Sequence, residues 1–559
     1  MARKPLYFVA GLGLVTALAL TGCAGSGAGA DSDKPSDSKP EAGAALTIAK
    51  PDGAITTESN NPWSGDSSAN KLGYKNVVFE PLAIVNPTGD NETTPWLAEK
   101  VTWNDDYTQL TVTPRAGVKW NDGEDFTADD ILFTFNLIKS TPAFDTGNIQ
   151  LTDIKKDGDD VVLTFAESKF VKQAQVLNIQ MVPEHIWKDV EDPTTFTNPD
   201  PVGTGPYVLE KFSSQSVTMT ARDDYWGGEP AVPTLYYVSY NDNTALTTAL
   251  ASGEADWAQA FISDIEGQYL SKDEHNIFWP ANVMAPDVLF LNTQEKPFDD
   301  VAFRKAVNMV IDREAHTTIA RENAGSQLTS ITGLPTPVGE KYIAPEYKGK
   351  EFSIDVDGAK KVLEDAGYTW EGEALIDPDG EPVEFTLQVP QGWNDYVTGI
   401  SLIADQVKKT LGADAKVDTP DVDTWWNAKR TGDFDAIMHW TDSGTTPYDL
   451  YSDTMDGRWL LAGDEVDYNF GRYDNPEATE LLSTYANSAS DEERTAAIEG
   501  VQKIFVEDVP VIPVGTHPIL AEFNTRNYVG WPSDDDPYAP GDPLQVAAVQ
   551  VLMNLEPAE

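Results

Sequence analysis

The chain has 559 residues, of which 40% are hydrophobic and 10% aromatic, a composition typical of a folded protein with more than one hydrophobic core. Its 39 Lys and Arg residues are outnumbered by 91 Asp and Glu residues, which gives a formal net charge of −52. Such a negative field repels nucleic acids and anionic lipid headgroups, so we exclude nucleic acid as a partner and do not expect adsorption to a membrane surface.

The N-terminus carries the only cysteine of the sequence, Cys23, directly behind Leu20-Thr21-Gly22. Arg3 and Lys4 precede an apolar run over residues 6–20, which is short for a membrane span. A charged start, a brief apolar core and small residues before a cleavage point are typical of a secretory signal. The position of the cysteine resembles the bacterial lipobox, in which the thiol is lipidated and becomes the new N-terminus.

We therefore predict a lipoprotein signal peptide over residues 1–22 and a lipidated Cys23. A diacylglyceryl group supplies two acyl chains, which suffice for stable anchoring. Residues 23–45 are small and polar apart from the cysteine and predict a flexible tether. The expected location is the extracytoplasmic face of the cell membrane. The alternative, an uncleaved membrane helix with a stray cysteine, is disfavoured because no second apolar span or stop-transfer charges follow.

From residue 46 onward, short strand patterns alternate with helical ones. Strands are predicted at residues 46–49, 161–165, 217–221, 385–389 and 511–514. Apolar residues at helical spacing predict helices at 129–139, 299–312, 355–367 and 400–411. Thr127 is the expected N-cap of the first of these helices, and Gly412 is expected to end the last. This succession predicts an α/β fold, and the absence of a repeat of 20–50 residues excludes solenoids and propellers.

No motif for catalysis is present. The sequence contains no G-x-x-x-x-G-K-[ST], no G-x-S-x-G and no H-E-x-x-H. Its five histidines are scattered without metal-ligand spacing: His185, His275, His316, His439 and His517. We therefore expect no enzymatic activity, no cofactor and no metal site.

Three segments in a fixed order carry a family resemblance. The first contains P-W-L-A-E at 95–99 and R-A-G-V-K-W-N-D-G-E-D-F-T-A-D-D-I at 115–131. The second contains G-T-G-P-Y at 203–207, R-D-D-Y-W-G-G at 222–228 and G-E-A-D-W at 253–257. The third runs from Leu291 to Arg313. Together they resemble the family 5 solute-binding proteins of bacterial ABC importers, which are receptors for dipeptides, oligopeptides and oligosaccharides.

The resemblance implies a two-lobed periplasmic-binding-protein-like fold with an extra domain and a hinged cleft between domains I and III. On this sequence it places domain I at 46–75, 200–290 and 515–559, domain II at 76–199 and domain III at 291–514. It implies a monomeric, lipid-anchored receptor that captures a short oligomer and delivers it to ABC permease subunits in the membrane. The alternatives are a secreted glycoside hydrolase and a surface adhesin that uses the same fold.

The identity of the ligand depends on domain III, and the sequence supports both an oligosaccharide and an oligopeptide. The region around Asp442 resembles the corresponding region of the family's peptide receptors, in which an aspartate at this place pairs with the α-ammonium group of the ligand. Sugar receptors resemble the T-P-Y at 446–448, the G-W-x-D loop around Trp393 and the W-P-S at 531–533. Tryptophan faces stack on pyranose rings, so the fifteen tryptophans favour an oligosaccharide slightly. The candidate ligand-binding residues are Trp393, Asn394, Trp425, Trp440, Asp442, Tyr448, Trp531, Trp63 and Trp257.

Overall fold

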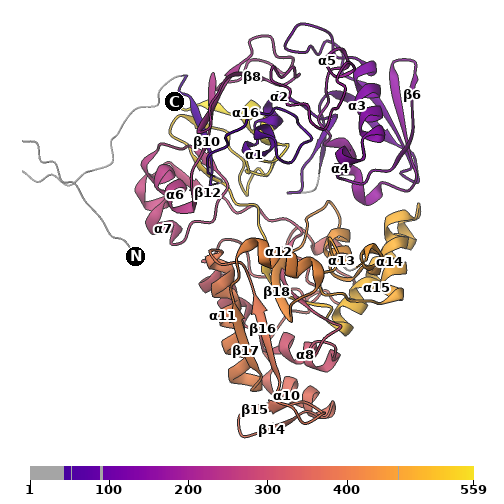
Figure 1. Cartoon of the computed structure of the whole chain (residues 1–559), viewed down its shortest axis with the longest axis vertical. Helices are drawn as coiled ribbons and strands as arrows, with labels where there is room; N and C mark the ends of the chain where they lie inside the picture. The colour runs from indigo at the N-terminus through magenta and orange to yellow at the C-terminus, as the bar shows by residue number, and fades with distance from the viewer. Residues whose placement is uncertain (1–42, 52, 89–91, 464) are drawn as a thin grey trace, which may run out of the picture. The chain divides into compact units, whose positions relative to one another are not determined.

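The computed structural model describes residues 43–51, 53–88, 92–463 and 465–559. Its largest sheet has seven strands that come from three separate parts of the sequence (Figure 1). Parallel pairing joins β1 to both β10 and β11, and the other neighbours are antiparallel. The strand order is β12 (Asn276–Phe278), β20 (Glu522–Asn524), β11 (Trp257–Ala258), β1 (Leu46–Lys50), β10 (Thr234–Ser239), β9 (Ser216–Ala221) and β8 (Tyr207–Phe212).

Short helices and the C-terminal segment complete the core on this sheet. One buried cluster joins residues of β1, β9 and β10 to α2 and α16, so the two ends of the described chain share a core. The helices are α1 (Ser68–Leu72), α2 (Lys75–Val78), α6 (Asn243–Ser252), α7 (Ile265–Gln268) and α16 (Ala548–Asn554). A small pair, β21 (Tyr528–Val529) and β22 (Glu556–Pro557), lies near the C-terminus.

A separate antiparallel sheet of four strands has its own core. Its order is β4 (Ala98–Trp103), β5 (Gln109–Pro114), β7 (Asp160–Phe165) and β6 (Leu151–Asp157). Helix α3 (Ala128–Ser140) begins at Thr127, whose side chain accepts from Asp129 N–H while Asp130 accepts from Thr127 N–H. The predicted cap at Thr127 is therefore confirmed. The remaining elements here are β2 (Ala83–Val85), β3 (Thr93–Pro95), α4 (Gln173–Leu177) and α5 (Glu184–Trp187).

The third sheet is mixed and is covered by helices on both faces. Its order is β17 (Asp414–Asp418), β16 (Glu384–Gln388), β18 (Ala436–Trp440), β13 (Pro286–Leu291) and β19 (Val511–Thr516). Because side chains alternate along a strand, Leu289 and Leu291 of β13 pack in one cluster, whereas Val288 and Phe290 pack in the other. This alternation explains why β13 is buried along its whole length.

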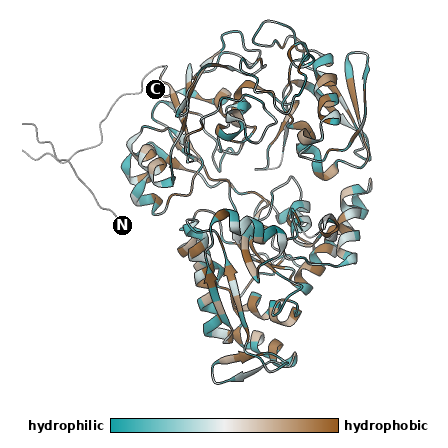
Figure 2. Cartoon of the chain, viewed as in Figure 1, coloured by the Kyte–Doolittle hydropathy of each residue, from teal (hydrophilic) through white to brown (hydrophobic). Residues whose placement is uncertain are grey.

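The helices on the two faces of this sheet are amphipathic, and Figure 2 shows them with hydrophobic and hydrophilic stripes. One face carries α8 (Val301–Val310), α10 (Val356–Asp365) and α11 (Asn394–Leu411). The other carries α12 (Val422–Thr431), α13 (Tyr448–Met455), α14 (Pro476–Asn487) and α15 (Asp491–Asp508). Gly412 caps α11 with a φ of 82°, as predicted. Helix α9 (Arg313–Ala315) continues into a π-helical turn at His316–Ala320, and β14 (Thr369–Glu371) pairs with β15 (Ala374–Ile376).

Two antiparallel segments connect the seven-stranded sheet to the five-stranded sheet. Ala281 and Ile519 exchange backbone hydrogen bonds of 2.8 and 2.9 Å, and His517 N–H donates to Ala285 O at 2.8 Å. These bonds link the pair of β12 and β20 to the pair of β13 and β19. This two-stranded crossing is the connection about which two lobes could rotate.

Two of the predicted domain boundaries need correction. Strand β13 belongs to the five-stranded sheet, so domain III begins near residue 286, before the predicted 291. Val77, Val78 and Phe79 belong to the core of the seven-stranded sheet, so that part of the predicted domain II (76–199) packs with domain I. Sequence motifs mark segments of the chain and do not show which sheet a flanking residue packs against.

Candidate functional site

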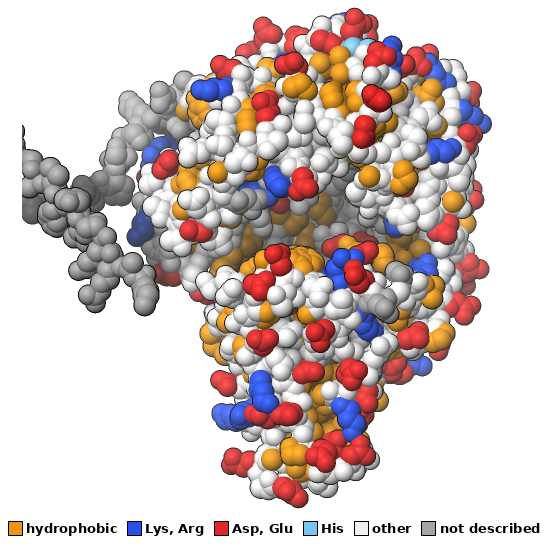
Figure 3. Space-filling view, viewed as in Figure 1, with side chains coloured by type: hydrophobic (Ala, Val, Ile, Leu, Met, Phe, Trp, Pro, Cys, Tyr) orange, Lys and Arg blue, Asp and Glu red, His pale blue; other side chains and the backbone are white. Residues whose placement is uncertain are grey.

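Three cavities follow one another where the part of the chain that contains the five-stranded sheet faces the parts that contain the seven-stranded and four-stranded sheets. The first cavity, of about 550 Å³, lies between residues 243–268 and residues 392–396. The middle cavity has a volume of about 300 Å³, and it shares Trp440 and His517 with the first. The third, which we call the acidic cavity, has a volume of about 840 Å³ and shares Asp442 with the middle one. Figure 3 shows the molecular surface hollowed between the same elements. The shared residues make the three cavities one elongated site.

Trp440 separates the first cavity from the middle cavity. It is the last residue of β18 and is half-buried, so that part of its indole is accessible. Its ring stacks on the imidazole of His517 with centroids 4.9 Å apart and an interplanar angle of 15°. The ring of Trp393 lies 5.7 Å from that of Trp440 at 31°. Trp393 and Trp440 therefore present neighbouring aromatic surfaces to the first cavity, where Asn394 is also found.

A buried ionic network lies beneath these aromatic side chains. Asp287 of β13 is fully buried and accepts hydrogen bonds from Tyr396 Oη and from His517 Nδ1, the latter at 2.9 Å. Arg321 donates to Asp395, and its Nε lies 3.8 Å from Asp287 Oδ2. Burial alone would raise the pKa of Asp287, but the charges of His517 and Arg321 and the two hydrogen bonds outweigh it and lower that pKa to about 2. Asp287 therefore remains ionised and holds His517 against Trp440.

The acidic cavity contains three neighbouring carboxylates, and Lys169, Lys172 and Arg458 lie elsewhere on its wall. Asp442 N–H donates to Asp453 Oδ2 at 2.8 Å, and Tyr468 Oη donates to Asp442 Oδ2. Burial, and then the charge of Asp442, raises the pKa of Asp449 to about 7, and burial also raises the pKa of Asp453. Within the described residues, no Lys, Arg or His forms an ion pair with these three carboxylates. Their arrangement favours a cationic group, such as an ammonium, in this cavity.

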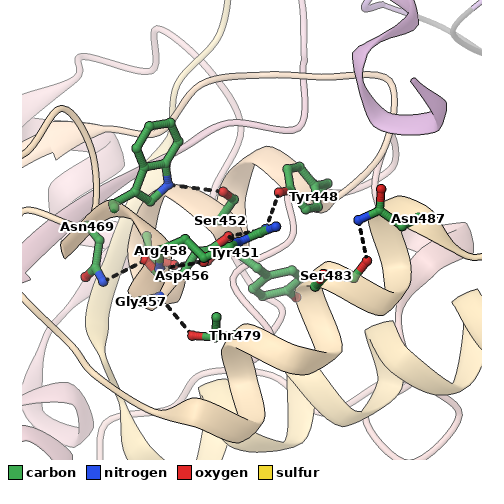
Figure 4. Close-up of polar contacts among 12 residues, drawn as sticks. Tyr448, Tyr451, Ser452, Asp456, Gly457, Arg458, Asn469, Thr479, Ser483 and Asn487 are labelled. Carbon is green, nitrogen blue, oxygen red and sulfur yellow. Dashed lines mark hydrogen bonds and ion pairs between the residues drawn. The ribbon is translucent and has the colours of Figure 1, made fainter. Parts of the chain in front are cut away.

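Part of the wall of the acidic cavity is a polar network along α13 and just after its end (Figure 4). Arg458 lies between Asp456 and Tyr448 and donates to both, with Nη2 2.9 Å from Tyr448 Oη. Trp459 Nε1 donates to Ser452 Oγ at 3.3 Å. Tyr448 is thus fixed at the wall of this cavity, although only 9% of its surface is exposed. Such a wall offers fixed donors and acceptors to a polar ligand.

Five of the nine predicted residues line these cavities, and four do not. Trp393, Asn394, Trp440, Asp442 and Tyr448 line at least one cavity. The predicted cleft position of Trp425 and Trp257 is wrong, because both indoles are 0% exposed. Trp257 donates to Gly541 O at 2.6 Å and packs 5.2 Å from Trp531, which is itself buried beside Phe523. Trp63 packs on Phe144 and Trp187 and lines none of the three cavities.

The predicted loop around Trp393 also differs from the structure. Asn394, Asp395 and Tyr396 form the first turn of α11, so the helix starts six residues before the predicted residue 400. Asp395 and Tyr396 are buried in the ionic network, which the sequence interpretation missed together with Asp287, Arg321 and His517. These residues are up to 230 positions apart in the sequence, so no local pattern connects them.

Neither a metal site nor a membrane span is found in the part of the chain that the structure describes. No group of three or more His, Cys, Asp or Glu residues there could hold a metal ion. No described helix is both long enough and apolar enough to cross a membrane. The predicted signal peptide, Cys23 and most of the tether lie outside the described residues.

The chain is similar to known binding proteins over most of its length. The model of bacterial extracellular solute-binding proteins, family 5 Middle, matches residues 92–459. The oligopeptide-binding protein AppA of Bacillus subtilis is 24% identical over 534 residues, which covers 91% of this chain and 92% of that protein. Protein XP55 of Streptomyces lividans is 28% identical over 455 residues, which covers 79% of this chain and 80% of that protein.

Solved structures agree with this assignment. A periplasmic oligopeptide-binding protein of Thermotoga maritima has a TM-score of 0.82 at 26% identity and covers 92% of this chain and 99% of its own. Its structure with bound mannohexaose has a TM-score of 0.76 at 26% identity, with coverages of 93% and 99%. The expected fold, a two-lobed periplasmic-binding-protein-like α/β fold, is confirmed. The chain belongs to the bacterial extracellular solute-binding proteins of family 5.

Proposed function

We propose that this chain is the lipid-anchored receptor of an ABC importer, which captures a short oligomer outside the cytoplasm and delivers it to a membrane permease. The observation that supports this most is the elongated site of three cavities, which share Trp440, His517 and Asp442. Capture requires no bond chemistry, only a higher affinity of the closed conformation for the solute. The lobes would close about the crossing at residues 281–286 and 516–521.

An oligosaccharide is the solute class that the aromatic walls favour. The accessible part of the Trp440 indole and the neighbouring ring of Trp393 offer apolar surface for sugar C–H groups. Asn394 and other polar side chains of the first cavity can bond hydroxyl groups. The Thermotoga maritima protein, at 26% identity, has been solved with mannohexaose bound.

An oligopeptide is the second candidate, and the acidic cavity favours it. Asp442, Asp449 and Asp453 share that cavity without an ion-pair partner among the described residues. A peptide α-ammonium would supply the missing positive charge through a charge-assisted hydrogen bond. Asp442 is exposed and lines both the middle and the acidic cavity, so it is the carboxylate that a ligand would reach first.

Calorimetric titration of the purified chain with mannohexaose and with a nonapeptide separates the two candidates. For a sugar, Trp440→Ala should weaken binding at least tenfold, whereas Asp442→Asn should change it little. For a peptide, Asp442→Asn should abolish binding, because the ammonium would lose its counter-charge. Asp433→Asn, at an exposed position outside the cavities, is the matched control. Release of shortened oligosaccharide products would favour the hydrolase alternative instead.

The tether and anchor form the second part of the proposal. Cys23 would hold the receptor at the membrane, and residues 24–45 would leave it free to reach a permease. Genes for two permease subunits and their ATPases beside this gene would support transport, and their absence would favour the adhesin alternative. We expect a monomer, which sedimentation at increasing concentration would test.

A further inference from the structure

Lys429 of α12 is a buried cation directly behind the wall of the solute site. Only 1% of its surface is exposed, and no carboxylate forms an ion pair with it within the described residues. Its Nζ lies inside an aromatic cage, 3.4 Å from the ring centroid of Trp426, 4.3 Å from that of Phe470 and 5.0 Å from that of Trp425. Cation–π attraction therefore replaces the ion pair that a buried ammonium usually requires.

The ammonium has one hydrogen-bonding partner among the described side chains, the imidazole of His439. Lys429 Nζ lies 3.3 Å from His439 Nε2, and His439 Nδ1 lies 2.7 Å from the carbonyl oxygen of Trp440. A carbonyl only accepts, so Nδ1 carries the proton and Nε2 must accept from Lys429. The contacts on both nitrogens therefore require a neutral imidazole in a single tautomer.

The imidazole of His439 is in turn the support of Trp440. The two rings stack with centroids 4.0 Å apart at 21°, and Trp425 stacks on the other side of His439 at 5.4 Å and 26°. His517 covers the opposite face of Trp440. The side chains thus form a column, Trp425–His439–Trp440–His517, whose third member lines the first and middle cavities.

We propose that Lys429 is a positioning residue for solute capture: its caged ammonium anchors Nε2 of His439 and so fixes the orientation of the imidazole, and His439 holds Trp440 at the wall of the site. A buried lysine at this position costs folding free energy, because its ammonium must be desolvated. An apolar side chain of similar length would fill the cage without that cost. We therefore infer that the charge of Lys429 stabilises the stacked column and that it is not needed for the packing of α12.

The charges around the column agree with this role. Burial lowers the pKa of Lys429 to about 7, with Asp442 opposing and Arg430 reinforcing the shift, so the ammonium form predominates below pH 7. Burial, and then the charge of Lys429, lowers the pKa of His439 far below its usual value, with a smaller opposing effect from Asp287 and a reinforcing one from His517. His439 is therefore neutral over the whole physiological range, as the stack and the Lys429 hydrogen bond require.

Nitrogen-15 NMR of the purified chain labelled at its five histidines tests the positioning without any ligand. In the wild type, His439 should show the Nδ1–H tautomer and should not titrate between pH 5 and 8. In Lys429→Met, the Nε2 acceptor loses its donor, so we expect the Nε2 resonance of His439 to move from its wild-type position while Nδ1 keeps its proton against the Trp440 carbonyl. His439→Gln assigns the signal, and Lys361→Met, an exposed lysine far from the cage, is the control. Identical His439 shifts in the wild type and Lys429→Met would overturn the proposal.

The second measurement rests on the proposed function and uses mannohexaose as its probe. Lys429→Met should weaken mannohexaose binding about tenfold while its melting temperature at pH 6 stays at or above that of the wild type, because the variant no longer buries a charge. Weaker binding together with a large loss of melting temperature would show a merely structural role and would overturn the proposal. If the wild type does not bind mannohexaose, the oligosaccharide assignment fails, and the histidine spectra alone decide the role of Lys429.

Discussion

Removing the charge of Asp287 is a direct perturbation of the network under the solute site. Asp287→Asn keeps the shape of the side chain and its ability to accept from Tyr396, but Arg321 and His517 lose the carboxylate between them. The folded-state pKa of about 2, compared with the ordinary 3.8, corresponds to about 2 kcal/mol of stabilisation at pH 7. We expect the free energy of unfolding to fall by about that amount.

The stabilisation by Asp287 should depend on pH. Because the folded-state pKa is lowered, the carboxylate contributes its full stabilisation above pH 4 and loses it as the pH falls towards 2. The difference between wild type and Asp287→Asn in urea unfolding should therefore be about 2 kcal/mol at pH 7 and about half of that at pH 3. Asp433→Asn, at an exposed position, should show no such difference. An Asp287→Asn effect of equal size at both pH values would refute the reasoning.

Three other variants test separate parts of the structure. Asp542 is buried, and burial raises its pKa to about 6. Its protonated carboxyl group therefore contributes fully to stability below about pH 4, and that contribution is lost as the pH rises through 6. In urea unfolding, Asp542→Asn should be more stable than the wild type by about 3 kcal/mol at pH 8 and equally stable at pH 4. Trp425→Ala should lower the melting temperature by several degrees through a core cavity, whereas Trp440→Ala should leave it within about two degrees and weaken solute binding; the reverse pattern in thermal shift would contradict their placement. Cys23→Ala should move the protein from the membrane fraction to the medium with unchanged solute affinity, and a variant that stayed in the membrane fraction would argue against the lipid anchor.

Much of the fold could be predicted because its signals are local. The N-cap at Thr127 and the C-cap at Gly412 follow from the hydrogen-bonding and backbone preferences of single residues. The strand at Val511–Thr516 is a short apolar run, which its burial on both faces explains. The order of sheets depends on contacts between distant segments, so the place of β13 had to come from the structure.

The candidate site was predictable only in part, for the same reason. Asp442 was identified through the family resemblance and Trp440 as a tryptophan able to stack on a sugar, and the structure places both at the end of β18, where they line the cavities. The sequence did not show which of Trp425 and Trp426 is buried. Consecutive residues of a helix point in different directions, and in the structure Trp425 is buried whereas 41% of Trp426 is exposed. Lys429 gave no sequence signal, since a lysine on an amphipathic helix is ordinarily solvated.

The central claim is that the cavities around Trp440 capture a short oligomer. Isothermal titration calorimetry of the wild type and Trp440→Ala against a panel of manno-, cello- and xylo-oligosaccharides and of peptides tests it most directly. We predict saturable wild-type binding to at least one oligosaccharide with a negative heat-capacity change, and binding weakened at least tenfold in Trp440→Ala. No binding to any member of the panel, or equal affinity in the two proteins, would contradict it.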